Sequence, residues 1–133
     1  MQILRHQVRP VSNSGPHLPR GLRRIIHPLG PLFRHLPLAL ALSIELPAPG
    51  DYRAMQVLDV PVLLVRGKDG RARAFLNACR HRGAPVVRDE CGTCDRMVCL
   101  YHSWSYDHKG DLVFVPDQRD FVGLNVEERG LVQ

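Results

Sequence analysis

Two cysteine–histidine pairs constrain this chain more than any other feature of its sequence. The first pair is Cys79-Arg80-His81, and the second is Cys99-Leu100-Tyr101-His102, with seventeen residues between them. Each pair lies in a loop-like segment between strand-like segments. Cysteine and histidine at such short spacings are typical of metal ligands. The fold must therefore bring two loops together so that four side chains face one site.

Two thiols and two imidazoles are the donor set of a [2Fe–2S] centre with mixed ligation. In such a centre two thiolates hold one iron and two imidazoles hold the other, which raises the reduction potential relative to an all-cysteine cluster. We therefore predict that Cys79 and Cys99 bind one iron and that His81 and His102 bind the other. The imidazole-bound iron, with less negative charge from its ligands, is predicted to accept the electron.

A zinc-binding module is an alternative interpretation of the same residues. Cys91 and Cys94 form a Cys-x2-Cys pair that could bind zinc tetrahedrally together with Cys99 and His102. That arrangement leaves the first pair, at Cys79, without a role. If the iron–sulfur interpretation holds, Cys91 and Cys94 are predicted to be free thiols at a tight turn leading into a strand at Met97, and a redox disulfide between them stays open.

The residues around both pairs resemble the Rieske domain of the large (alpha) subunit of aromatic ring-hydroxylating oxygenases. The resemblance runs from near Pro37 to the last residue, and two positions depart from the family pattern: Leu100 stands where Pro is usual, and Ser103 where Gly or Ala is frequent. The segments that carry the resemblance are Cys-Arg-His-Arg-Gly-Ala-Pro (79–85), Cys-Leu-Tyr-His-Ser-Trp-Ser-Tyr-Asp-His-Lys-Gly-Asp-Leu (99–112), Leu-Pro-Ala-Pro-Gly-Asp-Tyr (46–52) and Val-Leu-Leu-Val-Arg-Gly-Lys-Asp-Gly (62–70).

The resemblance implies an all-β fold, a Rieske-type antiparallel β-sandwich with two cluster-binding loops at one end. It implies a Rieske-type [2Fe–2S] cluster as cofactor, with Cys79, His81, Cys99 and His102 as its ligands. We expect an irregular Arg/Pro-rich arm over residues 1–36 and the Rieske domain over residues 37–133. Prolines and glycines interrupt the arm too often for a long helix.

Short apolar runs with β-branched residues, separated by turn residues, predict the strands themselves. The expected strands are Tyr52–Leu58, Val60–Arg66, Ala72–Asn77, Met97–Leu100, Ser103–Asp107 and Leu112–Val115. A hairpin is predicted where Val62–Arg66 and Ala72–Leu76 flank Lys-Asp-Gly. Tyr106 and Asp107 are expected to pack, or to cap the turn that follows.

Charge is unevenly distributed along the chain. The net charge is +5, but residues 1–44 contain six arginines and no acidic residue, whereas residues 45–133 carry twelve basic and thirteen acidic side chains. The arm lacks the interleaved aromatic residues of a nucleic-acid interface, so we expect no nucleic-acid partner. The longest apolar run, 36–46, is too short and too interrupted to span a membrane. We expect a cytoplasmic protein, since thiolate ligands suit a reducing compartment.

The function implied by the resemblance is single-electron transfer. In the oxygenases a separate C-terminal domain activates oxygen at a mononuclear iron held by two histidines and a carboxylate; here His108 is the only histidine after His102. We expect the N-terminal part of such a large subunit, acting as an electron-transfer module and not as an enzyme by itself. Its partners would be a reductase or ferredoxin donor and, if the gene is split, a chain bearing the mononuclear iron. A free-standing Rieske ferredoxin is the alternative.

Two further residues have predicted roles near the cluster. Gly83 is expected to let the first loop bend closely, because a side chain there would crowd the sulfides or the second loop. Trp104 is expected to shield the cluster from water. In the Rieske proteins of respiratory complexes a serine at this position hydrogen-bonds the cluster, so Trp104 predicts a potential toward the low end of the Rieske range.

Overall fold

The computed structural model describes residues 36–123 and 125–133, and residues 39–133 form one compact unit. The arm over residues 1–36 lies outside the described residues, apart from Leu36. Two antiparallel sheets and three short 3-10 turns make up the regular structure of the described part. The predicted all-β, antiparallel fold is confirmed. No helix among these residues is long and apolar enough to cross a membrane.

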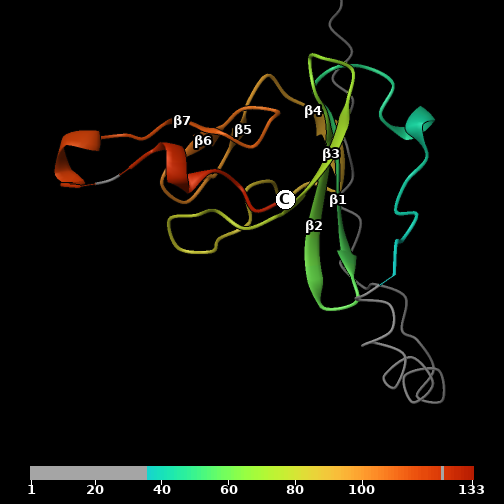
Figure 1. Ribbon diagram of the computed structural model, residues 1–133, viewed down its shortest axis with the longest axis horizontal. Helices are drawn as coiled ribbons and strands as arrows, with labels where there is room; N and C mark the ends of the chain where they lie inside the picture. Colours follow the sequence, from blue (N-terminus) through green and yellow to red (C-terminus); the bar gives the residue numbers. More distant parts are fainter. Residues whose placement is uncertain (1–35, 124) are drawn as a thin grey trace, which may run out of the picture. The chain divides into compact units, whose positions relative to one another are not determined.

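The first sheet has four strands in the order β3-β2-β1-β4. Its central strand, β2, buries three consecutive apolar residues, Leu63, Leu64 and Val65, because both of its faces are covered. The bounds are Asp51–Val57 for β1, Val60–Arg66 for β2, Ala72–Leu76 for β3 and Cys91–Thr93 for β4. Figure 1 shows β1, β2 and β3 in shades of green, with β4, in amber, beside β1.

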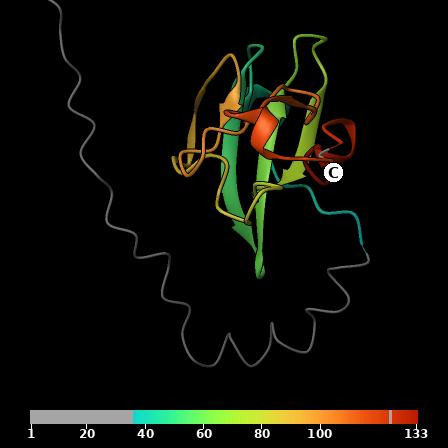
Figure 2. The same ribbon diagram turned by 90° about the vertical axis from the view of Figure 1, so that its left-hand side faces the viewer.

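The second sheet has three short strands in the order β5-β6-β7. They are Met97–Val98 (β5), Ser105–Tyr106 (β6) and Leu112–Phe114 (β7). Met97, Tyr106 and Leu112 lie opposite one another across the strands, and all three are buried. They pack with Leu63, Val65 and Phe75 of the first sheet, so the core lies between two layers. Figure 2 shows the second sheet in front of the first.

Most of the predicted strands coincide with observed strands, but several of them are longer than the observed ones. The predicted hairpin is confirmed, with Arg66 opposite Ala72 and Val62 opposite Leu76. The sequence predicts strands up to Leu100 and from Ser103, but β5 ends at Val98 and β6 begins at Ser105, because the intervening residues form the second cluster loop. The turn expected at Cys91–Cys94 is wrong in part: Cys91–Thr93 pairs with β1 as an edge strand.

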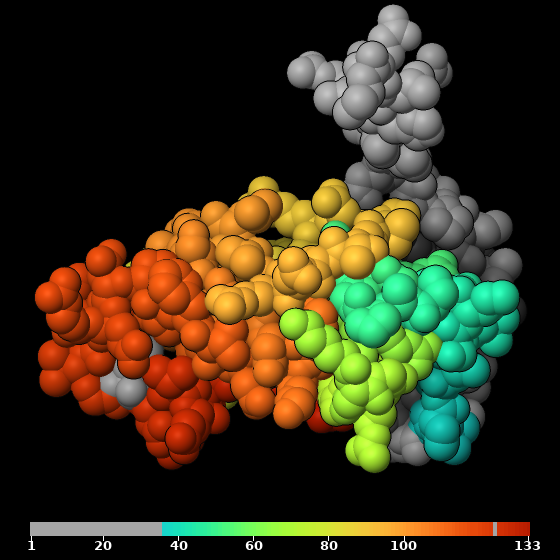
Figure 3. Space-filling model, turned by 90° about the horizontal axis from the view of Figure 1, so that it is seen from above, coloured from blue at the N-terminus to red at the C-terminus, as the bar shows by residue number. Residues whose placement is uncertain are grey.

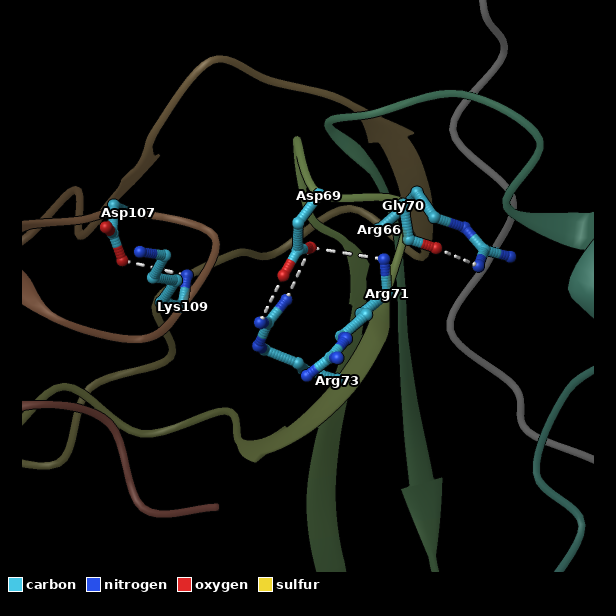
Figure 4. Close-up of polar contacts among 7 residues, drawn as sticks. All are labelled: Arg66, Asp69, Gly70, Arg71, Arg73, Asp107 and Lys109. Carbon is cyan, nitrogen blue, oxygen red and sulfur yellow. Dashed lines mark hydrogen bonds and ion pairs between the residues drawn. The ribbon is translucent and has the colours of Figure 1, made fainter.

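Polar side chains fix the turns that close the hairpins. Asp69 forms an ion pair with Arg73 and accepts the backbone N–H of Arg71, while Arg66 donates to the carbonyl of Gly70 (Figure 4). At the β6–β7 turn, Asp107 Oδ1 accepts the N–H groups of Lys109 and Asp111. Asp107 therefore caps this turn as predicted, and Tyr106 is fully buried.

Candidate metal centre

The two loops that carry the predicted ligands have the same backbone hydrogen bonds. In the first loop, Cys79 N–H donates to Ala84 O and Cys79 O accepts from Gly83 N–H, both at 2.8 Å. In the second loop, Cys99 N–H donates to Trp104 O at 2.9 Å and Cys99 O accepts from Ser103 N–H at 2.8 Å. Each cysteine is therefore held at the start of a tight loop closed four and five residues later.

Both loops need a left-handed residue at the same position. The φ angle is +73° at Gly83 and +57° at Ser103. We expected a side chain at position 83 to crowd the second loop. This is wrong, because a Cβ at Gly83 would have no neighbouring atom within 4 Å. The positive φ itself favours glycine here. Ser103 adopts the same conformation without that freedom.

The four predicted ligands fall into an inner pair and an outer pair. Cys79 and Cys99 are 4% and 2% exposed, whereas His81 is half-buried and His102 is exposed. The two imidazole rings lie edge to face with their centroids 4.5 Å apart. Two buried thiols and two more exposed imidazoles are the kinds of donor that a dinuclear cluster with mixed ligation uses.

His81 carries an unsatisfied buried atom at this site. Its Nδ1 is buried and has no hydrogen-bond partner among the described residues. Buried polar atoms are nearly always bonded, so an orphaned imidazole nitrogen beside a second histidine and two cysteines fits a metal-ligating atom. Burial lowers the pKa of His81, and the nearby His102 and Arg82 lower it further. The neutral ring, which is the metal-binding form, is thereby favoured.

Aromatic side chains hold the ring of His81 in place. Trp104, 2% exposed, stacks on it at 4.9 Å with an angle of 10° between the rings. Phe121 meets both rings edge on, at 5.9 Å from His81 and 5.8 Å from Trp104. Trp104 therefore orients an imidazole, and its role as a shield of the cluster from water stays a prediction. Phe121 was not identified from the sequence, because its distance along the chain gives no sign of this contact.

Tyr106 is a second residue that the sequence did not identify as part of the site. Its hydroxyl lies 3.2 Å from Cys79 Sγ and accepts the N–H of Arg80 at 3.0 Å, which leaves its own proton free to donate to the sulfur. Burial raises the pKa of Tyr106, and the contact with Cys79 raises it further, so the donor stays protonated. Only its place opposite Met97 and Leu112 in the second sheet brings it to Cys79.

Cys79 experiences opposing effects on its protonation. Burial raises the pKa of its thiol, the hydrogen bond from Tyr106 lowers it, and the adjacent Cys99 raises it again. The two thiols are thus close enough to affect each other. Since metal ligation requires thiolates, binding at this pair releases protons.

The zinc set of Cys91, Cys94, Cys99 and His102 gains no support from this geometry. Within residues 36–123 and 125–133, no three or more His, Cys, Asp or Glu side chains are grouped as ligands of one ion. The four predicted iron ligands do not form a group of this kind either. Cys91 and Cys94 are free thiols, one exposed and one half-buried.

A pocket on the described surface is lined by residues outside these two loops. It has a volume of about 280 Å³ and is lined largely by charged residues of the β2–β3 and β6–β7 turns, including Lys68, Asp69 and Lys109. Figure 3 shows the tip of the β2–β3 hairpin, in lime green, against the amber and orange segments around residues 95 and 108. None of the four predicted ligands lines this pocket.

Comparisons with known proteins agree with the paired loops. The large oxygenase component of the naphthalene 1,2-dioxygenase system of Pseudomonas putida is 38% identical over 125 residues, covering 91% of this chain and 28% of that protein. The anthranilate 1,2-dioxygenase large subunit of Burkholderia cepacia is 41% identical over 85 residues, covering 64% of this chain and 20% of the relative. The chain thus spans about a fifth to a little over a quarter of the curated relatives it matches.

Solved structures show the same relationship. A naphthalene 1,2-dioxygenase with bound indole superposes with a TM-score of 0.67 at 40% identity, covering 71% of this chain and 22% of that one. The quaternary ammonium Rieske monooxygenase CntA with γ-butyrobetaine gives a TM-score of 0.73 at 28% identity, covering 80% and 31%. The Rieske [2Fe–2S] domain family matches residues 37–127. The chain therefore belongs to the Rieske [2Fe–2S] domain family, as the Rieske region found in large subunits of aromatic ring-hydroxylating oxygenases, and its cofactor is a Rieske-type [2Fe–2S] cluster.

Proposed function

We propose that Cys79, His81, Cys99 and His102 bind the cluster and that the chain serves as the electron-transfer module of a ring-hydroxylating oxygenase. The observation that carries this proposal is the buried, unpaired Nδ1 of His81, which lies next to His102 and two residues from a buried thiol. When bound, a Rieske cluster accepts and releases one electron at a time. Cys79 and Cys99 supply its thiolates, and the two histidines supply its imidazoles.

The different exposures of the proposed ligands indicate the side from which an electron enters and leaves the cluster. Cys79 and Cys99 are buried within the core, whereas His81 is half-buried and His102 is exposed. Electrons therefore enter and leave along the imidazole side. Trp104 and Phe121 pack on the His81 ring, whose unpaired Nδ1 is buried.

The surface around the histidines is suited to docking a redox partner. Arg80 and Arg82 flank His81 and are exposed, and Leu100 and Tyr101 are 69% and 56% exposed beside His102. A contact surface with an apolar centre and positive charges at its rim favours an acidic partner. The proposed donor is a reductase or ferredoxin, and the proposed acceptor is a mononuclear iron in a catalytic domain, on the same or a separate polypeptide.

The domain limits belong to the same proposal. Residues 37–133 form the Rieske domain, and residues 1–36 precede it as an arm. The family match over 37–127 and the compact unit over 39–133 support this division. Four thiols, all free among the described residues, suit a reducing compartment, so we place the protein in the cytoplasm.

Anaerobic purification of the recombinant chain tests the ligand assignment. We expect two irons and two acid-labile sulfides per chain, and a Rieske-type electron paramagnetic resonance signal with a low average g value after dithionite reduction. Cys79→Ser and His102→Ala should abolish that signal. Cys91→Ser, which changes an exposed thiol outside both loops, is the matched control and should leave it intact. Bound zinc, or folded wild-type protein without metal, would contradict the assignment.

A further inference from the structure

Asn77 is a buried polar residue of the first cluster loop with no role in the proposed electron path. It lies between the end of β3 and Cys79, and 8% of it is exposed. Its backbone N–H donates to Pro61 O of β2 at 2.8 Å, which anchors it to the first sheet. Burying an amide side chain is unfavourable unless its polar atoms are bonded. The partners of this amide therefore indicate its role.

The Asn77 side chain makes three hydrogen bonds across the loop. Its Oδ1 accepts the N–H groups of Val86 at 3.0 Å and Val87 at 3.1 Å, and its Nδ2 donates to Val87 O at 2.9 Å. These bonds enclose residues 78–85, which include Cys79 and His81. The backbone bonds of Cys79 with Gly83 and Ala84 lie inside this closure.

The arrangement requires both a donor and an acceptor on one short side chain. Asparagine supplies two acceptor sites on its carbonyl oxygen and two amide protons. An aspartate at this position keeps the two accepted bonds and loses the donated one, and a leucine of similar size loses all three. Val86 is 1% exposed, so its N–H would have no water to replace the lost partner.

We propose that Asn77 is a positioning residue that holds the first cluster loop in the conformation that presents Cys79 and His81 to the cluster. The inference rests on the proposed function, since it takes these two residues as ligands. None of the side-chain hydrogen bonds of Asn77 reaches a predicted ligand. Its effect is to restrict the loop before the cluster is bound, which reduces the entropy that ordering the ligands would cost.

The first test uses the chain without its cluster. Hydrogen exchange of the Val86 and Val87 amides is measured in wild type, Asn77→Asp and Asn77→Leu. We expect Asn77→Leu to speed exchange at both amides about tenfold, because each amide loses the hydrogen bond that it donates to Asn77 Oδ1. Amides of the β1–β2 ladder serve as the internal control and should exchange at the wild-type rate. Unchanged protection at Val86 and Val87 in a folded variant would overturn the proposal.

The second test measures iron release from the reconstituted chain to a chelator. The rate should be higher than in wild type both in Asn77→Asp, which loses the donated hydrogen bond and places a carboxylate oxygen against Val87 O, and in Asn77→Leu, which loses all three hydrogen bonds. Val65→Ala is the matched control: it removes packing at a fully buried position of β2 and leaves every hydrogen bond of the first cluster loop in place. If Asn77 acts only through global stability, Val65→Ala and the Asn77 variants will release iron at rates set by melting temperature alone, and the proposal fails. Should Asn77→Leu not fold, Asn77→Asp decides the outcome.

The two tests separate this inference from the proposed function. If the wild-type chain never takes up a cluster although the Val86 and Val87 amides are protected, the ligand assignment fails and the positioning role falls with it. If the wild-type chain holds its cluster and both Asn77 variants release iron at the wild-type rate, the inference fails and the ligand assignment stands.

Discussion

At the scale of single residues, we expect Tyr106 and Trp104 to have opposite effects on the reduction potential of a cluster bound by Cys79. Trp104 stands where the resemblance to the Rieske proteins of respiratory complexes implies a serine that hydrogen-bonds the cluster, so we expect it to favour a low reduction potential. Tyr106 donates toward Cys79 Sγ, and a hydrogen bond to a ligand thiolate stabilises the reduced, more negative state. The low potential predicted from Trp104 is therefore partly offset by a contact that the sequence did not indicate.

Removing the hydroxyl of Tyr106 should lower the reduction potential. Tyr106→Phe keeps the buried ring and loses the donor to Cys79. We expect the midpoint to fall by roughly 20–60 mV, the one-electron equivalent of a hydrogen bond of about 0.5–1.5 kcal/mol. Redox titration followed by electron paramagnetic resonance measures the change. Tyr52→Phe, in the first sheet, is the control, and an equal or higher midpoint in Tyr106→Phe would contradict the assigned hydrogen bond.

Gly83 and Ser103 both have a positive φ, so we expect removing the glycine at 83 and introducing one at 103 to have opposite effects on the stability of the domain. Gly83→Ala should destabilise the domain by about 1 kcal/mol through φ alone, because the space around its Cβ position is open. Ser103→Gly should stabilise it by about 0.5–1 kcal/mol, since serine is held at a positive φ. Urea unfolding measures both. Equal stabilities for Ser103→Gly and wild type would show that this φ carries no strain.

At the scale of secondary-structure elements, the Asp69–Arg73 pair ties the β2–β3 turn to the start of β3. The N–O distance is 2.7 Å, and Asp69 also accepts the N–H of Arg71 (Figure 4). The Arg73 guanidinium holds the pKa of Asp69 well below its usual range. A carboxylate with a lowered folded-state pKa adds stability above its unfolded pKa of about 3.9, and this contribution is lost as the pH falls further.

Asp69→Asn should therefore lower the melting temperature at neutral pH and have a shrinking effect in acid. Thermal unfolding of the cluster-free chain at pH 7, 5 and 3 measures the difference from wild type. We expect the difference to be the same at pH 7 and 5 and smaller at pH 3. Asp59→Asn, at the β1–β2 turn, provides a comparison without this ion pair. A difference that grows in acid would contradict a lowered pKa for the Asp69 carboxyl in the folded chain.

At the scale of the whole domain, the segment 131–133 connects the two sheets. Leu131 N–H donates to Gly110 O of the β6–β7 turn at 2.7 Å, and Val132 O accepts Leu76 N–H at the end of β3 at 2.8 Å. The Leu131 side chain is 8% exposed and belongs to the core. In Figure 1 this end of the chain lies beside the lower end of β3. The segment thus stabilises the stacking of the layers that hold the two cluster loops together.

Leu131→Ala should destabilise the domain by roughly 2–4 kcal/mol, as for other buried leucines. Its neighbour Val132, 47% exposed, is the matched control, and Val132→Ala should cost less than about 0.5 kcal/mol. Chemical denaturation of both variants provides the free energies of unfolding. Similar small effects for the two would mean that Leu131 does not anchor the second sheet.

Local signals predicted much of this domain. The hairpin around Lys-Asp-Gly, the cap at Asp107 and the all-β class follow from turn residues and short β-branched runs, which act over a few residues, whereas the antiparallel sandwich was implied by the family resemblance. Strand β4 was missed, because Cys91–Thr93 has no strand-like pattern and exists only through its pairing with β1. The predicted strands extend into the edges of the second cluster loop. Backbone hydrogen bonds close this loop, and no particular residue types in the sequence indicate them.

Two thiols and two imidazoles, at spacings that suit a dinuclear iron centre and inside segments that resemble one family, could be recognised from the order of the residues alone. The three-dimensional fold was needed to show that Cys79 and Cys99 are buried, that Tyr106 contacts Cys79, and that Trp104 and Phe121 pack on His81. The physical reason is the separation along the chain over which each effect acts. Ligand spacing and turn chemistry are local properties of the chain, whereas burial and contacts between residues 27 or 40 positions apart depend on how the two sheets stack.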